Sequence, residues 1–337
     1  MTFQEMLDAL GEAYYIEPLC VYHMREEDSK VTLGELLKPR VCRFCGKKEP
    51  DVSFKKVAHA IPQFTGNNRL FSLYECDNCN EMFSKYESQF AGMMTLAHSL
   101  SQTHGKKGVP SYKPNIQRDS RVDVDSEGIK IKQYPDSGDF VTYNENDGGT
   151  PTITVKGSIS YRPVDIAKIL TKMALTIMPE EEMDYFKVTK KWLLEKSDSP
   201  RSIIRGMAVN MFLYPGNNPF LFPSCGIYKK KKDAGNEFPY MIFFLCYSNF
   251  MFQMFIPYCE KDRIAFCSGK SVSIKCPRVP NVLDSKGIPS KMTLIDCSSN
   301  QIEQSSTIIH MDASELTREG VYELKTANKN NGKQVDN

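Results

Sequence analysis

The sequence predicts an α+β protein, in which a small metal-braced module precedes a mixed, largely antiparallel β domain with two or three helices. Two Cys-x-x-Cys pairs near the N-terminus predict the module, because together they can supply four thiolates to one zinc ion. Alternating apolar and polar residues after residue 121 predict strands. Apolar residues at three- and four-residue steps predict the helices.

Length and charge restrict the class of protein. The 337 residues suffice for two domains, and 25% charged with 41% hydrophobic residues is ordinary for a soluble globular protein. The net charge of +2 means that any affinity for nucleic acid must come from local patches. The first fifteen residues contain acids and no apolar run, so we expect no signal peptide and a cytoplasmic location.

Eleven cysteines do not indicate a disulfide framework, because the number is odd and the chain is large enough to fold without disulfide cross-links. Seven of them lie outside the two pairs, and we interpret most as buried reduced thiols. These are Cys20, Cys225, Cys246, Cys259, Cys267, Cys276 and Cys297.

An aromatic run over residues 240–256 has nearly the length of a membrane span. Ser248 and Asn249 lie at its centre, and its aromatic content suits strands better than a lipid-facing helix. We therefore expect a buried β-hairpin that turns near Tyr247-Ser248-Asn249, and no association with a membrane.

Composition divides the chain into five segments. We predict a helical lead-in over 1–38, based on EMLDAL and LGELL, and the cysteine module over 39–100. A polar linker rich in Gly, Pro and Lys follows over 101–120. An α+β domain of unknown role covers 121–325, with helices across 162–198, and the tail 326–337 is expected to be disordered.

The two cysteine pairs are Cys42 with Cys45 and Cys76 with Cys79. The gap between the pairs is longer than the roughly 15 to 20 residues of a bare zinc ribbon, so a segment the size of a β-hairpin is inserted. Spacing alone also fits a non-catalytic zinc module that binds DNA or a protein partner.

The inserted residues add a candidate base. His59 follows Val57-Ala58 and precedes a turn, and Gly66-Asn67-Asn68 forms a polar loop. Asn80 comes directly after the last cysteine and opens a helix that begins between Asp77 and Asn80, since apolar residues recur after it with helical spacing.

These residues resemble an HNH endonuclease of the ββα-metal superfamily, through CRFC, AHAIP-x3-GN and ECDNCN-x2-FS-x2-E over about residues 40–92. The resemblance implies a zinc-braced ββα-metal (HNH) module, with structural Zn²⁺ on the four cysteines. It implies His59 as the general base for phosphodiester hydrolysis, and Asn67 or Asn68 as the middle asparagine. It implies Asn80 as a ligand to a catalytic Mg²⁺ or Mn²⁺.

The residue types fit that chemistry. An imidazole titrates near neutral pH, and a hard divalent ion prefers oxygen ligands such as the Asn80 amide. Glu87 lies two helical turns beyond Asn80, where it either adds a carboxylate or is a solvated surface acid. Ala58 stands where many HNH enzymes have a metal-binding acid or histidine. The ion therefore has few protein ligands, unless Glu75 or Glu87 supplies one.

Nucleic acid is the expected partner, with DNA preferred over RNA. The candidate phosphate contacts are Lys55, Lys56, Arg69 and Lys85, and the lysine run 229–232 is either a second contact or a solvated loop. HNH modules are often fused to other domains in restriction and anti-phage proteins. By that resemblance, the α+β domain recognises a substrate or binds a regulatory ligand or protein partner. Nothing in the sequence indicates the oligomeric state.

Overall fold

The computed structural model describes residues 16–105, 107–114, 120–133, 140–144, 151–262 and 274–312. The chain divides into two compact units, each built from segments that are distant in sequence. The first comprises the described residues of Met1–Gly92, Thr103–Gly108 and Tyr161–Glu303. The second comprises those of Met93–Gln102, Val109–Ser160 and Gln304–Asn337.

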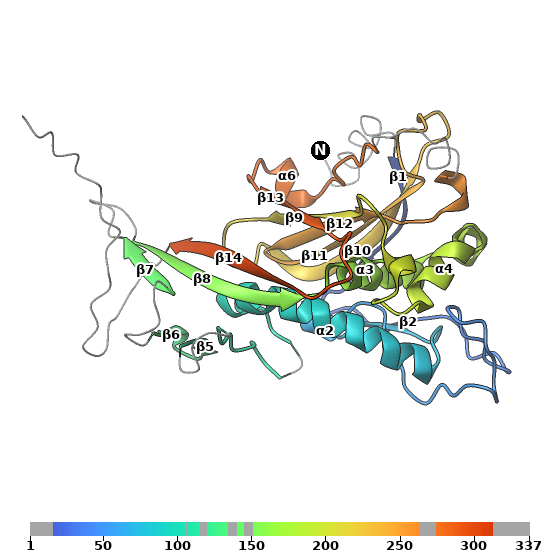
Figure 1. Cartoon of the computed structure of the whole chain (residues 1–337), viewed down its shortest axis with the longest axis horizontal. Coiled ribbons are helices and arrows are strands. Elements are labelled where there is room, and N and C mark those ends of the chain that lie inside the picture. Colours follow the sequence, from blue (N-terminus) through green and yellow to red (C-terminus); the bar gives the residue numbers. More distant parts are fainter. Residues whose placement is uncertain are drawn as a thin grey trace, which may run out of the picture. The chain divides into compact units, whose positions relative to one another are not determined.

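A six-stranded antiparallel sheet is the centre of the first unit (Figure 1). Its order is β1 (Ile16–His23), β10 (Phe220–Lys230), β11 (Met241–Ser248), β12 (Phe250–Phe255), β9 (Ala208–Leu213) and β13 (Lys291–Asp296). The predicted hairpin over 240–256 is confirmed, because β11 pairs with β12 and Tyr247 faces Phe250 at the turn. Every residue of β11 is buried, which explains the apolar run. No helix of the described ranges is long and apolar enough to cross a membrane.

The predicted helices between 162 and 198 are present. Helix α3 (Pro163–Ile177) begins with a proline at its first position and buries all fifteen residues. It contacts β10 and β11, and the shorter α4 (Lys187–Leu194) packs beside it. Helix α2 (Asp77–Leu100) starts where the sequence predicted, and α6 (Val282–Ser285) is a single turn. In Figure 1, α3 lies between α2 and the sheet.

The helical lead-in predicted for 1–38 is wrong over its described part. Residues 16–23 form β1 and pair with β10, and β2 (Val31–Leu33) follows. The LGELL segment forms no helix, and Leu36 and Leu37 are 73% and 66% exposed. So short an apolar repeat cannot hold a helix without a partner surface. EMLDAL and the tail 326–337 lie outside the described residues.

A three-stranded sheet adjoins the cysteines. Strand β4 (Leu70–Ser72) lies between β2, which runs parallel to it, and β3 (Ala58–His59), which runs antiparallel. The antiparallel pair β3–β4 is the insertion that the long gap between the cysteine pairs predicted. Pairing fixes Ala58 opposite Ser72 and His59 opposite Phe71.

The second unit contains the strands predicted before residue 160. Strands β5 (Arg121–Asp125) and β6 (Gly128–Lys132) form a hairpin, and β8 (Thr152–Tyr161) lies between β14 (Glu303–Asp312) and β7 (Val141–Asn144). Tyr112, from the segment predicted as a linker, is buried in the core of this unit. Its backbone bonds to that of Val122, so part of the polar segment is packed structure.

Candidate active site

The four paired cysteines converge in the first unit. Their sulfurs all lie within 4.8 Å of one another, with 3.7 Å between Cys42 and Cys79 and 3.8 Å between Cys45 and Cys76. A tetrahedral zinc ion with bonds of about 2.3 Å holds its sulfurs about 3.8 Å apart. The cluster therefore fits zinc, as the spacing of the pairs predicted.

Local backbone geometry prepares this cluster for a cation. Gly46 adopts a φ of +70°, which lets its N–H reach the Cys42 carbonyl at 2.9 Å. The pKa of Cys42 is lowered to about 5, chiefly by the hydrogen bond between the Cys42 and Cys79 sulfurs and also by backbone N–H groups that point at the Cys42 sulfur. The same hydrogen bond raises the pKa of Cys79. Zinc binds cysteine in its thiolate form.

His59 lies at the end of β3, where its ring contacts Phe71 with centroids 4.8 Å apart. The imidazole is half-buried, whereas neighbouring Ala58 is 3% exposed. Adjacent side chains on a strand point to opposite faces, so Ala58 faces the core. The candidate base therefore lies at the end of a short strand with its ring partly enclosed.

Asn67 organises the loop that follows His59. Its amide group donates to the carbonyls of Ile61 (2.6 Å) and Leu70 (3.0 Å), and its carbonyl oxygen accepts from the N–H groups of Arg69 and Leu70. The side chain is completely buried, while Asn68 is exposed. Asn67 therefore closes the turn between β3 and β4.

Helix α2 carries the other predicted ion ligands. Asn80 and Glu87 are half-buried and lie seven residues apart, on the same face. The pKa of Glu87 is raised, mainly by burial, and is also influenced by Lys172 and by the carboxylate of Glu75. Glu87 is therefore a partly enclosed acid with Lys172 of α3 as a neighbouring charge. Within the described ranges, only the cysteines form a group of three or more His, Cys, Asp or Glu ligands.

Comparison with protein families matches residues 42–96 to the model described as HNH endonuclease. This segment is an HNH domain. Comparisons with curated proteins and with solved structures gave no match. The cysteine cluster, β3, β4 and most of α2 all fall within the matched segment, so the domain consists of two strands and a helix beside a four-cysteine site.

Sequence reasoning missed a buried ion pair beside the HNH domain. Lys172 of α3 lies 2.8 Å from a carboxylate oxygen of Glu75, and the two side chains are 2% and 0% exposed. Lys172 also donates to the backbone carbonyl of His59 at 3.0 Å. Glu75 is thereby committed to Lys172. The sequence gives no signal for this contact beyond a charged residue inside an apolar helix.

Arg43, between the first two cysteines, is buried, with 9% of its surface exposed. Its guanidinium donates to the carbonyls of Leu175, Thr176 and Met178 at 2.9 to 3.2 Å and pairs with Glu180 at 2.6 Å. Its Cζ atom lies over the Tyr74 ring, 3.5 Å from the ring centroid. Arg43 therefore donates to the terminal carbonyls of α3. It thereby anchors the first cysteine knuckle, the turn that carries Cys42 and Cys45, to that helix.

The predicted nucleic-acid contacts differ in availability. Lys55, Lys56 and Lys85 are exposed. The N–H groups of Lys55 and Lys56 each bond to Asp77 at 3.0 Å, which fixes their loop against the start of α2. Arg69 instead donates to the carbonyl of Glu26. In the lysine run, Lys229 pairs with Glu182 at 2.5 Å, so it is structural rather than a solvated contact.

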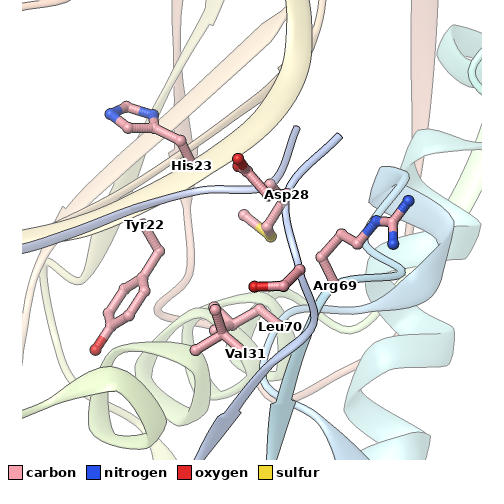
Figure 2. Close-up of a pocket in the computed structure, with 8 residues that line it drawn as sticks. Tyr22, His23, Asp28, Val31, Arg69 and Leu70 are labelled. Carbon is pink, nitrogen blue, oxygen red and sulfur yellow. The ribbon is translucent and has the colours of Figure 1, made fainter. Parts of the chain in front are cut away.

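A pocket of about 270 Å³ lies beside the HNH domain, at the end of β1 and the starts of β2 and β4 (Figure 2). Its lining includes Tyr22, His23, Asp28 and Arg69. His23 bonds to Ser224 at 2.9 Å, and burial lowers its pKa. The Asp28 carboxylate and the Arg69 guanidinium have opposite charges, so the charge of the pocket does not select an anionic or a cationic ligand.

Proposed function

We propose that this protein is a metal-dependent HNH endonuclease that hydrolyses phosphodiester bonds in DNA, in the cytoplasm, with His59 as the general base. The match of residues 42–96 to the HNH endonuclease family carries this proposal. A half-buried imidazole at the end of β3, within the matched segment, supports the role given to His59.

Each residue has a role in this scheme. Zinc on Cys42, Cys45, Cys76 and Cys79 is structural, because thiolates fill all four positions. His59 removes a proton from the attacking water. Asn67 closes the turn between β3 and β4 and so holds the backbone that follows His59. Asn80 and Glu87 offer oxygen ligands to Mg²⁺ or Mn²⁺. That ion, when bound, supplies the positive charge that phosphodiester hydrolysis requires.

A non-catalytic zinc module that binds nucleic acid or a protein is the second candidate. Two observations favour it. Ala58 faces the core, and no second group of three acidic, histidine or cysteine ligands exists among the described residues. A catalytic ion would then depend on few protein ligands, water and the substrate phosphate.

Cleavage of supercoiled plasmid with Mg²⁺ or Mn²⁺ tests the two candidates. We expect His59→Ala to lower the rate by about 10²- to 10⁴-fold, the usual contribution of a general base, with the zinc content unchanged. His104→Ala is the matched control, because His104 is an exposed histidine of the same unit. Cleavage by His59→Ala at the wild-type rate rules out this base. A parallel RNA substrate tests the preference for DNA.

A further inference from the structure

The strand that carries His59 is held from outside the HNH domain. Strand β3 has two residues, and the chain leaves it at once for the buried turn Ala60-Ile61-Pro62. Lys172, 113 residues further along the chain, donates to the carbonyl of His59 at 3.0 Å. A charge-assisted hydrogen bond of this kind fixes the peptide plane at the strand end. It thereby fixes the direction in which the imidazole leaves the backbone.

Lys172 is itself fixed on several sides. Its ammonium lies 2.8 Å from Glu75 and 5.9 Å from the centroid of the Phe83 ring on α2. The pair is almost fully enclosed, so solvent does not screen it. Glu75 directly precedes the cluster residue Cys76, and Arg43 anchors the end of the helix that carries Lys172. The ammonium therefore joins three elements: β3, the cysteine cluster and α3.

We propose that Lys172 is a positioning residue for His59, which aligns the base through its backbone carbonyl and takes its own orientation from Glu75. This inference rests on the proposed function. A buried ion pair by itself is weak support for stability or function, since apolar replacements are often tolerated. The third contact, to the residue that carries the base, distinguishes this pair from a purely structural one.

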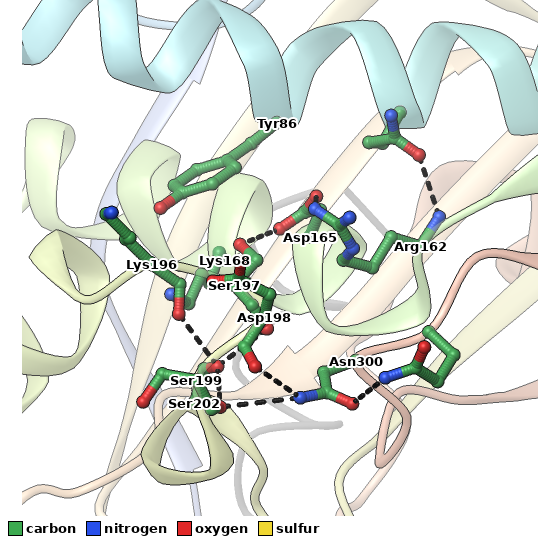
Figure 3. A network of polar contacts seen from close by, with 12 residues as sticks. Tyr86, Arg162, Asp165, Lys168, Lys196, Ser197, Asp198, Ser199, Ser202 and Asn300 are labelled. Carbon is green, nitrogen blue, oxygen red and sulfur yellow. Dashed lines mark hydrogen bonds and ion pairs between the residues drawn. The ribbon is translucent and has the colours of Figure 1, made fainter.

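Helix α3 offers a matched control one turn earlier. Lys168 is also fully buried, and it donates to the carbonyl of Glu195 at 2.5 Å, outside the HNH domain. It lies 5.3 Å from the Tyr86 ring and belongs to the polar network around Asp165 and Ser197 (Figure 3). Lys168→Met removes a buried ammonium from the same helix without removing the bond to His59.

The test uses full-length Lys172→Met and the double variant Glu75→Gln/Lys172→Met, in which no buried carboxylate is left without its partner. We expect kcat for plasmid cleavage to fall about ten- to a hundredfold in both, the effect of displacing a catalytic group by about 1 Å. The KM for DNA and the zinc content stay at wild-type values. Lys168→Met keeps kcat within about twofold of wild type.

Carbonyl-¹³C and ring-¹⁵N labelling of histidine gives a readout independent of activity. His59→Ala assigns the His59 signals. We expect these signals to shift in both Lys172 variants and to stay in place in Lys168→Met. The proposal is overturned if the His59 signals or kcat stay unchanged in the Lys172 variants. It is also overturned if Lys168→Met loses as much kcat as they do. A double variant that loses zinc or its fold also overturns it, because Lys172 is then structural. If wild-type protein does not cleave DNA, the proposed function fails, and the His59 signals alone decide the positioning contact.

Discussion

The cysteine cluster and His59 lie in the same 55-residue HNH domain, at residues 42–96, but their surroundings are constructed differently. The cluster takes all four ligands from two short knuckles, and its sulfurs already have the spacing of a tetrahedral ion. Among the residues that the structure describes, no comparable set of ligands surrounds His59. Its surroundings combine a strand end, a helix face and a lysine from α3.

This difference separates a local site from an assembled one. A closed thiolate site needs only the spacing within each knuckle and a hairpin between the knuckles. A catalytic site has to admit substrate and cannot be closed by ligands on all sides, so packing from elsewhere must hold its groups in place. Changes to the cluster should therefore affect folding, whereas changes around His59 should affect cleavage.

Cys79→Ser should have the largest effect. We expect loss of bound zinc and unfolding of the HNH domain, because structural zinc contributes on the order of 10 kcal/mol in small zinc domains. Elemental analysis and thermal unfolding measure both changes. Cys276→Ser, at a half-buried cysteine outside the cluster, is the control and should retain zinc. A Cys79→Ser protein that keeps its zinc and its melting temperature contradicts the closed-site description.

Arg43→Met should destabilise the first unit by about 2–4 kcal/mol, because three carbonyls at the end of α3 lose their donor. The Glu180 pair adds little, since that carboxylate is 78% exposed. Urea unfolding gives the free energy, and the zinc content should remain at one ion. Lys47→Met, an exposed residue of the same knuckle, should change the free energy by less than about 0.5 kcal/mol. Equal effects of the two variants would refute the anchoring role.

Asn80→Ala should leave folding intact and act on cleavage. We expect a rate about tenfold lower and a higher Mg²⁺ requirement, because the ion loses an oxygen ligand. Mg²⁺ titration of the cleavage rate measures both. Asn78→Ala is the control, since Asn78 is exposed in the same turn of α2. An unchanged Mg²⁺ requirement in Asn80→Ala places the ion elsewhere.

Ala58→Asp should have the smallest effect on metal dependence. Residue 58 faces the core, so a carboxylate there points away from His59 and changes the Mg²⁺ requirement by less than about twofold.

Glu87→Gln should raise the Mg²⁺ requirement a few-fold, because Glu87 shares a helix face with Asn80. Glu81→Gln, at an exposed acid of the same helix, serves as its control. For Ala58→Asp, a clearly lower Mg²⁺ requirement of cleavage would mean that the strand bends at His59 and turns residue 58 toward the ion.

Structural features that depend on about ten consecutive residues were predicted correctly from the sequence. The Cys-x-x-Cys knuckles, the start of α2 beside Asp77 and the β11–β12 turn each depend on neighbouring residues. The helical lead-in failed because Ile16–His23 pairs with β10, about 200 residues away in sequence. Local apolar spacing cannot reveal such a partner. Tyr112 was placed in a linker for the same reason, since its burial depends on packing against Val122.

The sequence by itself determined the ligands of the cysteine cluster, the hairpin-sized insertion and the candidate base, because spacing and side-chain chemistry are local properties. Tertiary structure alone decided what surrounds His59. It buried Ala58, paired Glu75 with Lys172 and placed the Lys172 ammonium on the His59 carbonyl. The cause is physical: a buried charge requires a partner wherever the chain brings one, and only the folded packing of α3 against the HNH domain brings these groups together.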